Sequence, residues 1–319
     1  MNIATTAWQV RSCLRRALLN FYKTERAEIV LQRQFAVQRD IVRLLEQRLS
    51  LGEISLTDVT QARIFLTKVS LSLSEAQRQA AEARVQLADA IGLPVSALNN
   101  VHISFGFMKE FPSARDIHLQ TIRRQALLSR PDILGALSEY AASESALQLE
   151  IAKQYPDIHL GPGYTFDQGD NKWAIGLSIT LPILNSNKGP IAEAKARYKE
   201  MSAKFIALQA KIIGEIDRAF AGYKSALREL ETADSMLSAK KEQLQSIQMM
   251  FEAGETDKLS ILSIQLECYS TTLLRLNALV NVQQSLGMLE DALEHPLQAD
   301  KTSFNFSQTD FGKSRFKKR

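Results

Sequence analysis

The residues best suited to chemistry are scattered along this sequence rather than grouped. Zinc sites need His and Cys ligands at short spacings, and disulfide frameworks need several paired cysteines. Cys13 and Cys268 lie far apart, each inside an apolar helical pattern, so we expect two small buried thiols. The histidines also lack ligand spacing and stand at His102, His118, His159 and His295. The sequence therefore predicts neither a metal site nor a bound cofactor.

Catalysis and nucleic-acid binding find equally little support. The chain has no phosphate-binding loop or nucleophile elbow, and acids such as Glu144 fall inside helical runs where solvation suffices. Net charge is only +4, and no basic block interleaves with aromatic residues. The one basic cluster, Lys313 to Arg319, closes a polar tail that we interpret as solvated. We expect a protein that is not an enzyme and does not bind nucleic acid.

Composition indicates a folded chain without membrane helices. Of the 319 residues, 45% are apolar and 23% are charged, which suits a folded protein. Residues 1–22 lack the pattern of a secretory signal peptide, because Arg11, Arg15 and Arg16 interrupt the apolar positions. No stretch of eighteen apolar residues occurs. Any membrane-spanning part would therefore have to consist of strands.

Proline and glycine leave very long stretches uninterrupted. Residues 1–51 contain neither, and after Gly52 the next stretch runs to Ile91. Pro190 opens a third run to Ala253, which is interrupted only by Gly214 and Gly222. As one helix, these 64 residues (253 − 190 + 1) would span roughly 95 Å at about 1.5 Å per residue. Globular helices are far shorter, so the sequence predicts fibre-like or tunnel-like helices.

Three long segments carry a heptad seam of small or apolar residues: the stretch after Gly52, the run that begins at Pro190 and the helical segment after Gly254. Spacings of four and three alternate along each seam, which is typical of coiled coils. At this point a simple coiled coil, rather than a tunnel, remains the alternative. The seam positions are Ala62, Leu66, Val69, Leu73, Ala76, Ala80, Ala83, Leu87 and Ala90; Ile216, Phe220, Tyr223, Leu227 and Leu230; and Leu259, Leu262, Leu266, Tyr269, Leu273, Leu276 and Val280.

An internal repeat with an offset of 202 residues organises these helices. Gly52-Glu53-Ile54-Ser55 is echoed by Gly254-Glu255-Thr256-Asp257, and residues 87–94 match residues 289–296 without a gap. Each copy reads as a long helix, a tight glycine turn, a second helix and a proline stop. Between the copies, we expect an irregular linker over 95–112 and helices over 114–130 and 132–154.

Residues 157–182 read as a β-hairpin with two different faces. Side chains alternate with period two around a polar turn at 168–172, and one face is small or polar. Strands of about 9–11 residues with such faces are typical of membrane barrels, and a soluble hairpin packed on a helix is the alternative. The side chains that we expect to face lipid include Tyr164, Phe166, Trp173, Ile175, Leu177 and Ile179.

Taken in order, these segments resemble the TolC family of outer-membrane efflux proteins. The resemblance rests on Arg130-Pro131-Asp132-Ile133, Tyr155-Pro156-Asp157, the strand at 173–180, Leu181-Pro182-Ile183 and the repeated glycine turns. It covers about residues 8–296 and looks most like the heavy-metal and cation branch.

The resemblance implies a mainly α fold, in which very long coiled-coil-like helices form a tunnel and a membrane hairpin joins a trimeric β-barrel. It implies a homotrimer in outer-membrane lipid that reaches into the periplasm and docks a periplasmic adaptor and an inner-membrane pump. The function implied is a passive conduit for efflux or type I secretion. Gly52 and Gly254 map to the adaptor-docking tips, and Asp58 to an acidic residue at the closed aperture. The repeat partner of Asp58 is Ser260.

The expected layout is a first-repeat helical hairpin (1–94), a linker (95–113), a second repeat (114–296) and a polar, basic tail (297–319). The second repeat would hold the β-hairpin (157–182) and a long helical hairpin (190–294). The first-repeat counterpart of the β-hairpin would lie upstream of residue 1. Three copies would then supply six strands, whereas membrane barrels usually need about eight or more. A soluble coiled-coil scaffold or a non-functional truncated product is therefore the alternative.

Overall fold

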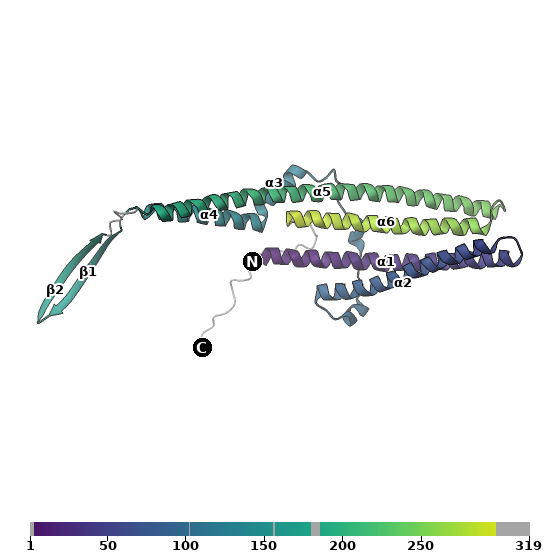
Figure 1. Ribbon diagram of the computed structural model, residues 1–319, viewed down its shortest axis with the longest axis horizontal. Helices are drawn as coiled ribbons and strands as arrows, with labels where there is room; N and C mark the ends of the chain where they lie inside the picture. Colours follow the sequence, from purple (N-terminus) through teal and green to yellow (C-terminus); the bar gives the residue numbers. More distant parts are fainter. Residues whose placement is uncertain (1–2, 102, 156, 180–185, 298–319) are drawn as a thin grey trace. The chain divides into compact units, whose positions relative to one another are not determined.

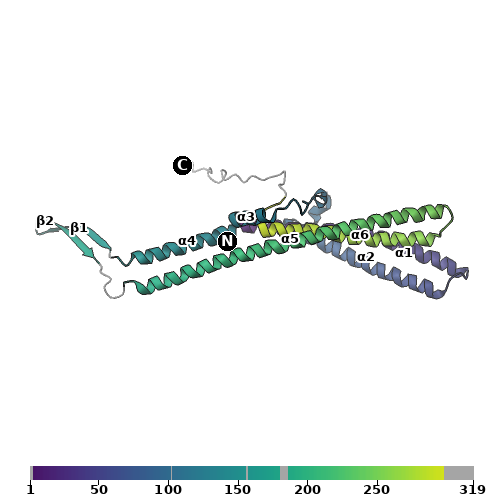
Figure 2. The same ribbon diagram turned by 90° about the horizontal axis from the view of Figure 1, so that it is seen from above.

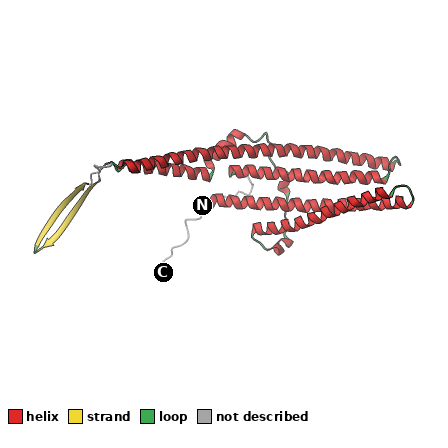
Figure 3. Cartoon of the chain, in the orientation of Figure 1, coloured by secondary structure: helices red, strands yellow, loops and turns green. Residues whose placement is uncertain are grey.

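A computed structural model describes residues 3–101, 103–155, 157–179 and 186–297. Within them the chain is mainly helical, with one two-stranded sheet (Figure 3), which confirms the predicted fold class. Residues 180–182 of the predicted hairpin, most of the predicted tail (298–319), His102 and Pro156 lie outside the described residues. The elements are α1 (Ile3–Ser50), α2 (Leu56–Ile91), α3 (Leu119–Ser129), α4 (Pro131–Ala152), β1 (Ile158–Asp167), β2 (Asp170–Ile179), α5 (Lys188–Glu252) and α6 (Lys258–Leu293).

The described residues form two compact units. One contains residues 3–122 and 216–297, and the other contains residues 123–215. Helix α5 contributes its first part to the second unit and its remainder to the first. We describe each unit by itself.

In the first unit, α1 packs against both α2 and α6 (Figures 1 and 2). Helix α5 is joined to α6 by ion pairs from Lys240 to Glu267 and from Arg275 to Asp234. Every position of the three predicted seams is buried or half-buried. Ile216 and Tyr223 of α5 and Leu87 of α2 are fully covered. The heptads therefore mark the faces that hold these helices together.

The internal repeat appears in the helix boundaries themselves. Helices α2 and α6 each have 36 residues, and both their starts (258 − 56) and their ends (293 − 91) are separated by 202 positions. Both helices end in a left-handed residue, Gly92 with φ 77° and Glu294 with φ 47°. The proline-stop segments thus close two helices of the same length in the same way.

The segment between the repeats differs from the prediction in two places. The linker contains two 3₁₀ helices, Val95–Asn100 and Gly106–Lys109. The next helix begins at Leu119 rather than at residue 114. Ser113 accounts for this difference, because its carbonyl accepts from the Asp116 amide at 3.0 Å and closes a separate turn before the helix starts.

The second unit combines α4, the hairpin and the first part of α5. The hydroxyls of Tyr140 in α4 and Tyr198 in α5 lie 2.5 Å apart, with ring centroids 5.1 Å apart. The hairpin turn contains two residues, Gln168 and Gly169, rather than the five predicted at 168–172. Both have positive φ (48° and 95°), as a two-residue turn matched to the twist of its strands requires.

Candidate functional site

The two glycine turns lie at the same end of the first unit, at the right of Figure 1. Gly52 and Gly254 have φ of 75° and 77°, a region that only glycine adopts without strain. The amide after each glycine bonds back to a helix carbonyl, Glu53 to Arg48 at 3.0 Å and Glu255 to Met250 at 2.8 Å. Each turn therefore stops one helix and reverses the chain within a few residues.

A serine and an aspartate cap the start of the second helix in each pair. The two residue types occupy opposite positions in the two repeats. At α2, the Ser55 hydroxyl accepts from the Asp58 amide, and the Asp58 carboxylate accepts from the Ser55 amide at 3.1 Å. At α6, Asp257 takes the place of Ser55 and accepts from the amide and hydroxyl of Ser260. Asp58 is exposed and has this capping role. Its aperture role stays a prediction.

An ion pair joins the two turns. Arg48 near the end of α1 donates to the Asp257 carboxylate at 2.8 Å. Asp257 therefore caps α6 and holds α1 with the same side chain. Backbone hydrogen bonding from Ser260, followed by the hydrogen bond from Arg48, holds the pKa of Asp257 below its usual value.

This lowered pKa makes the contact sensitive to acid. Because the pKa of Asp257 is depressed by folding, its stabilisation is present above the unfolded value of about 4 and is lost as pH falls through the folded value. Asp257→Asn retains a good capping residue but removes the charge. We expect this variant to melt below the unsubstituted chain at pH 7, and by a smaller margin near pH 3. An equal difference in Tm at both pH values would contradict the assignment.

The β-hairpin exposes one continuous apolar face. The register pairs Tyr164 with Trp173, whose ring centroids lie 4.8 Å apart, and it pairs Leu160 with Leu177. The predicted lipid-facing residues thus share one face, and the opposite face carries pairs such as Gly161 with Gly176 and His159 with Ser178. The large apolar side chains are 44% to 84% exposed: Ile158, Leu160, Tyr164, Phe166, Trp173, Ile175, Leu177 and Ile179.

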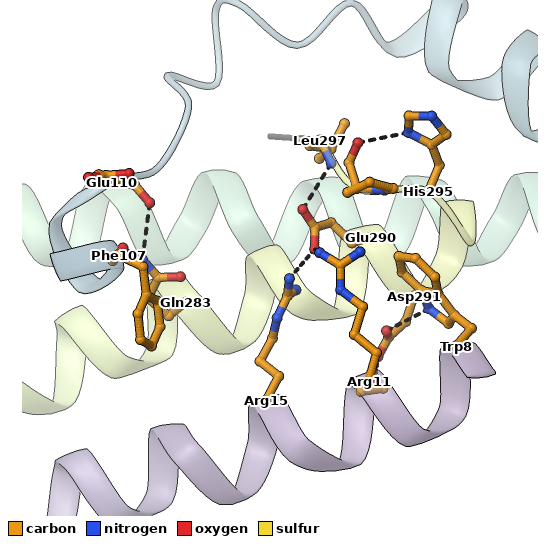
Figure 4. A network of polar contacts seen from close by, with 12 residues as sticks. Trp8, Arg11, Arg15, Phe107, Glu110, Gln283, Glu290, Asp291, His295 and Leu297 are labelled. Atoms are coloured by element: carbon orange, nitrogen blue, oxygen red, sulfur yellow. Dashed lines mark hydrogen bonds and ion pairs between the residues drawn. The ribbon is translucent and has the colours of Figure 1, made fainter. Parts of the chain in front are cut away.

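A polar network between α1 and α6 was not predicted (Figure 4). The Glu290 carboxylate is only 3% exposed and forms an ion pair with Arg15, with Arg11 at 3.8 Å. It also accepts from the Leu297 amide at 2.9 Å. Beside it, Asp291 accepts from the Trp8 indole at 2.9 Å. The one signal in the sequence was the internal repeat, in which Glu290 corresponds to Ala88, a residue that is buried in the structure.

Two further residues adapt α6 to this network. A Cβ at Gly287 would lie 3.0 Å from Arg15 Cδ, so the glycine leaves the room that the arginine occupies. The Gln283 amide donates to the carbonyls of Phe107 at 3.0 Å and Glu110 at 3.2 Å. Tyr223 of α5 donates to the Pro112 carbonyl at 2.5 Å, and burial raises its pKa to about 12. The linker is thereby fastened to α5 and α6.

The Arg-Pro-Asp motif forms a local cap in the second unit. Arg130 donates through two nitrogens to the Asp132 carboxylate, at 3.0 and 2.7 Å, and Asp132 also accepts from the Ile133 amide at 2.8 Å. Burial works against ionisation of Asp132, but the bonds from Arg130 outweigh it and lower its pKa. The motif fixes the start of α4.

Other expectations concern cysteines, metals and membrane helices. Cys13 is exposed rather than buried, because its neighbours Arg11, Ser12 and Arg15 form the face of α1 that contacts α6. In the described part of the chain, no three His, Cys, Asp or Glu side chains gather where they could hold a metal ion. None of the described helices is both long and apolar enough to cross a membrane.

Known proteins resemble the chain over most of its length. It is 24% identical over 270 residues to the pyoverdine export outer membrane protein OpmQ of Pseudomonas aeruginosa, which covers 77% of this chain and 54% of the relative. It is 24% identical over 253 residues to the cobalt-zinc-cadmium resistance protein CzcC of Cupriavidus metallidurans, covering 77% and 58%. The chain thus spans little more than half the length of these relatives.

A solved structure and a family model agree with these sequence relatives. The outer membrane protein VceC of Vibrio cholerae superimposes with a TM-score of 0.70 at 19% identity, covering 92% of this chain and 72% of VceC. The family model described as outer membrane efflux protein matches residues 122–294, more than half of the chain. The chain therefore belongs to the outer membrane efflux protein family.

Proposed function

We propose that this chain is the outer-membrane channel component of an efflux or type I secretion assembly, through which substrates pass without chemical change. The exposed apolar face of the β-hairpin carries this proposal. Eight large apolar side chains, each at least 44% exposed, share that face, while the opposite face is small or polar. Such faces suit lipid outside a barrel and water inside it.

A soluble coiled-coil scaffold explains the hairpin less well. Contiguous exposed apolar patches on soluble proteins mark binding or membrane surfaces. A hairpin packed on a helix would cover one of its faces, but both strands are exposed along their whole length among the described residues. Membership of the outer membrane efflux protein family also supports the channel.

A comparison of the two repeats supports self-association. Helix α6 lies between α5 and α1, whereas α2 packs on α1 and leaves Phe65, Leu71 and Val85 46% to 67% exposed. A second copy would cover this face with one of its own long helices. We propose a homotrimer in outer-membrane lipid, in which three copies of the paired helices enclose the conduit and each hairpin contributes to one barrel.

We place the binding sites for the partner proteins at the two glycine turns. A periplasmic adaptor and an inner-membrane pump would dock near Gly52 and Gly254, and Asp58 would line the closed aperture. The Arg48–Asp257 ion pair links the two helical hairpins at this end, so partner binding could shift the tips only by displacing that contact.

A pair of adjacent substitutions tests the proposal. Leu177 lies on the apolar face of β2 and Ser178 on the opposite face. In the source cell, Leu177→Asp should abolish recovery of the protein in the outer-membrane fraction, because a carboxylate there would face hydrocarbon. Ser178→Asp should preserve that recovery, because it would face water.

The distribution between membrane and soluble fractions decides the outcome. Recovery of the unsubstituted protein and both variants from the soluble fraction alone would support the scaffold or a non-functional product. Equal loss of both variants from the outer membrane would show sensitivity of the strand to any charge, and would contradict the assignment of the two faces.

A further inference from the structure

One face of α2 is exposed although its counterpart on α6 is covered. The α6 seam that begins at Leu259 continues, with the same spacings of three and four, to Gly287, and all of its positions are buried or half-buried. Shifted back by 202, the same positions run along α2 from Thr57 to Val85, and every one of them is exposed. We call these positions the second seam of α2. Its large apolar side chains are 45% to 67% exposed: Ile64, Leu71 and Val85.

The other faces of α2 and α6 do not differ in this way. The seam of α2 from Ala62 to Ala90 and its counterpart 202 positions later on α6 are both buried or half-buried throughout. A third face, which includes Ser72 of α2 and Leu274 of α6, is exposed in both helices. Within the described residues, what distinguishes α2 from α6 is therefore a missing neighbour along the second seam.

The neighbour that covers the seam of α6 is α1. The two helices pack together, and Gly287 lies against the side chain of Arg15. Helix α1 ends at Ser50 and α5 ends at Glu252, again 202 positions apart (252 − 50). Residues 205–252 of α5 are therefore the counterpart of α1. Because the second seam is exposed in the chain itself, the α5 that fits it is that of a second copy.

The sizes of the side chains support this pairing. Within the chain, the long helix α1 contributes the bulky Trp8, which donates to α6, and α6 contributes Gly287. On α5 the counterparts of the α1 residues that contact α6 include Ala210 and Gly214, which are small and exposed. On α2 the counterpart of the glycine is the larger Val85. One helix is bulky where the other is small in both pairings, as helices that interlock require.

We propose that the second seam of α2 binds residues 205–252 of α5 from a second copy, in the register that α6 and α1 adopt within one chain. The interface rests on the self-association proposed above, and it specifies which helices meet and in which register. The two halves of the contact lie on different elements of each chain. Such a contact repeats from copy to copy and closes into a ring when the rotation allows it.

The contacts within the chain set the level at which residues of the two copies meet. The Arg48–Asp257 ion pair lies near the end of α1 and the start of α6, so the two helices run antiparallel. The contact of Gly287 with α1 lies near their other ends. The counterpart of Leu71 is about halfway between these contacts, so Leu71 should meet the other copy around Thr232.

Photocross-linking from α2 tests the register. A chain with p-benzoylphenylalanine in place of Leu71 is produced in the source cell together with a differently tagged, unsubstituted chain, and both are purified in detergent. We expect irradiation to join the two tagged chains, with the joined peptides around Thr232. The same photoreactive residue in place of Ser72 is the matched control. It should join the copies at least about fivefold less, because only side chains in contact lie within its reach.

Two leucine substitutions give a second measurement that needs no cross-linker. Leu71 and Leu274 are exposed to similar extents, 67% and 55%, but Leu274 lies on the face that is exposed in both repeats. By sedimentation velocity in detergent, Leu71→Asp should weaken self-association at least about tenfold, because it places a carboxylate in an apolar contact. Leu274→Asp should leave self-association unchanged.

The outcomes separate the interface from the proposed channel. A self-associated chain whose cross-links from position 71 reach residues outside 205–252, or a segment of other sequence, would overturn the interface and leave the channel standing. A single-copy mass for the unsubstituted chain would overturn both the interface and the homotrimer. Equal weakening by the two aspartate variants would overturn the assignment of the seam. Cross-links around Thr232 in chains recovered only from the soluble fraction would support the interface and contradict the outer-membrane location.

Discussion

Arg15→Met should lower the free energy of unfolding by about 3–5 kcal/mol, because it leaves the buried Glu290 carboxylate without its main countercharge. Arg11 remains at 3.8 Å, and the Leu297 amide supplies one hydrogen bond. Neither matches the direct contact that Arg15 makes. Urea-induced unfolding followed by circular dichroism in detergent at pH 7 measures the loss.

A double variant separates the charge from the packing. In Arg15→Met/Glu290→Leu both charges are gone, so the stability should recover to within about 1–2 kcal/mol of the unsubstituted chain. Recovery should be incomplete, because the Leu297 amide loses its acceptor. If single and double variants were equally unstable, the ion pair would not be the source of the effect.

Arg78 offers a matched arginine in an exposed setting. It pairs with Glu75 and Glu82 on the same helix, and its side chain is 56% exposed. Arg78→Met should leave the unfolding transition unchanged within measurement, because water solvates the freed carboxylates. A loss as large as that of Arg15→Met would show that burial does not distinguish the two sites.

The seams, the repeat and the hairpin could be predicted because each depends on local spacing. Apolar residues at alternating spacings of four and three face one side of a helix, and alternation by two gives a strand with two faces. A few matching residues indicated a repeat with an offset of 202 positions. The boundaries of α2 and α6 are separated by the same 202 positions. Positive φ at Gly52 and Gly254 follows from residue type in the same way.

The α1–α6 network could not be predicted, because it depends on contacts between residues about 275 positions apart. Nothing local distinguishes Glu290 from the exposed glutamates of the same helices. The exposure of Cys13 depends likewise on which face of α1 meets α6. The shortened hairpin turn was mispredicted for another reason: the polar residues 170–172 read as loop, but Lys172 belongs to β2 and pairs with Asp167 across the turn at 2.7 Å.

Replacing glycine in the two tip turns should lower the free energy of unfolding, whereas replacing a glycine inside α5 should raise it. Val at Gly52 and Gly254 together should cost about 2–4 kcal/mol, since a β-branched residue is strained at a φ near +75°. A Cβ at either position meets no atom within 4 Å, so the loss would come from the backbone and not from a clash.

Gly222→Ala is the matched control, because Gly222 lies inside α5, is exposed and also has open space around it. Its helical backbone accepts alanine, so this change should stabilise the chain by about 0.5–1 kcal/mol. Urea unfolding of the three proteins measures both effects. If the double valine variant were as stable as the unsubstituted chain, the left-handed turns would not be needed to reverse the helices, and the tips would have to form from other contacts such as Arg48–Asp257.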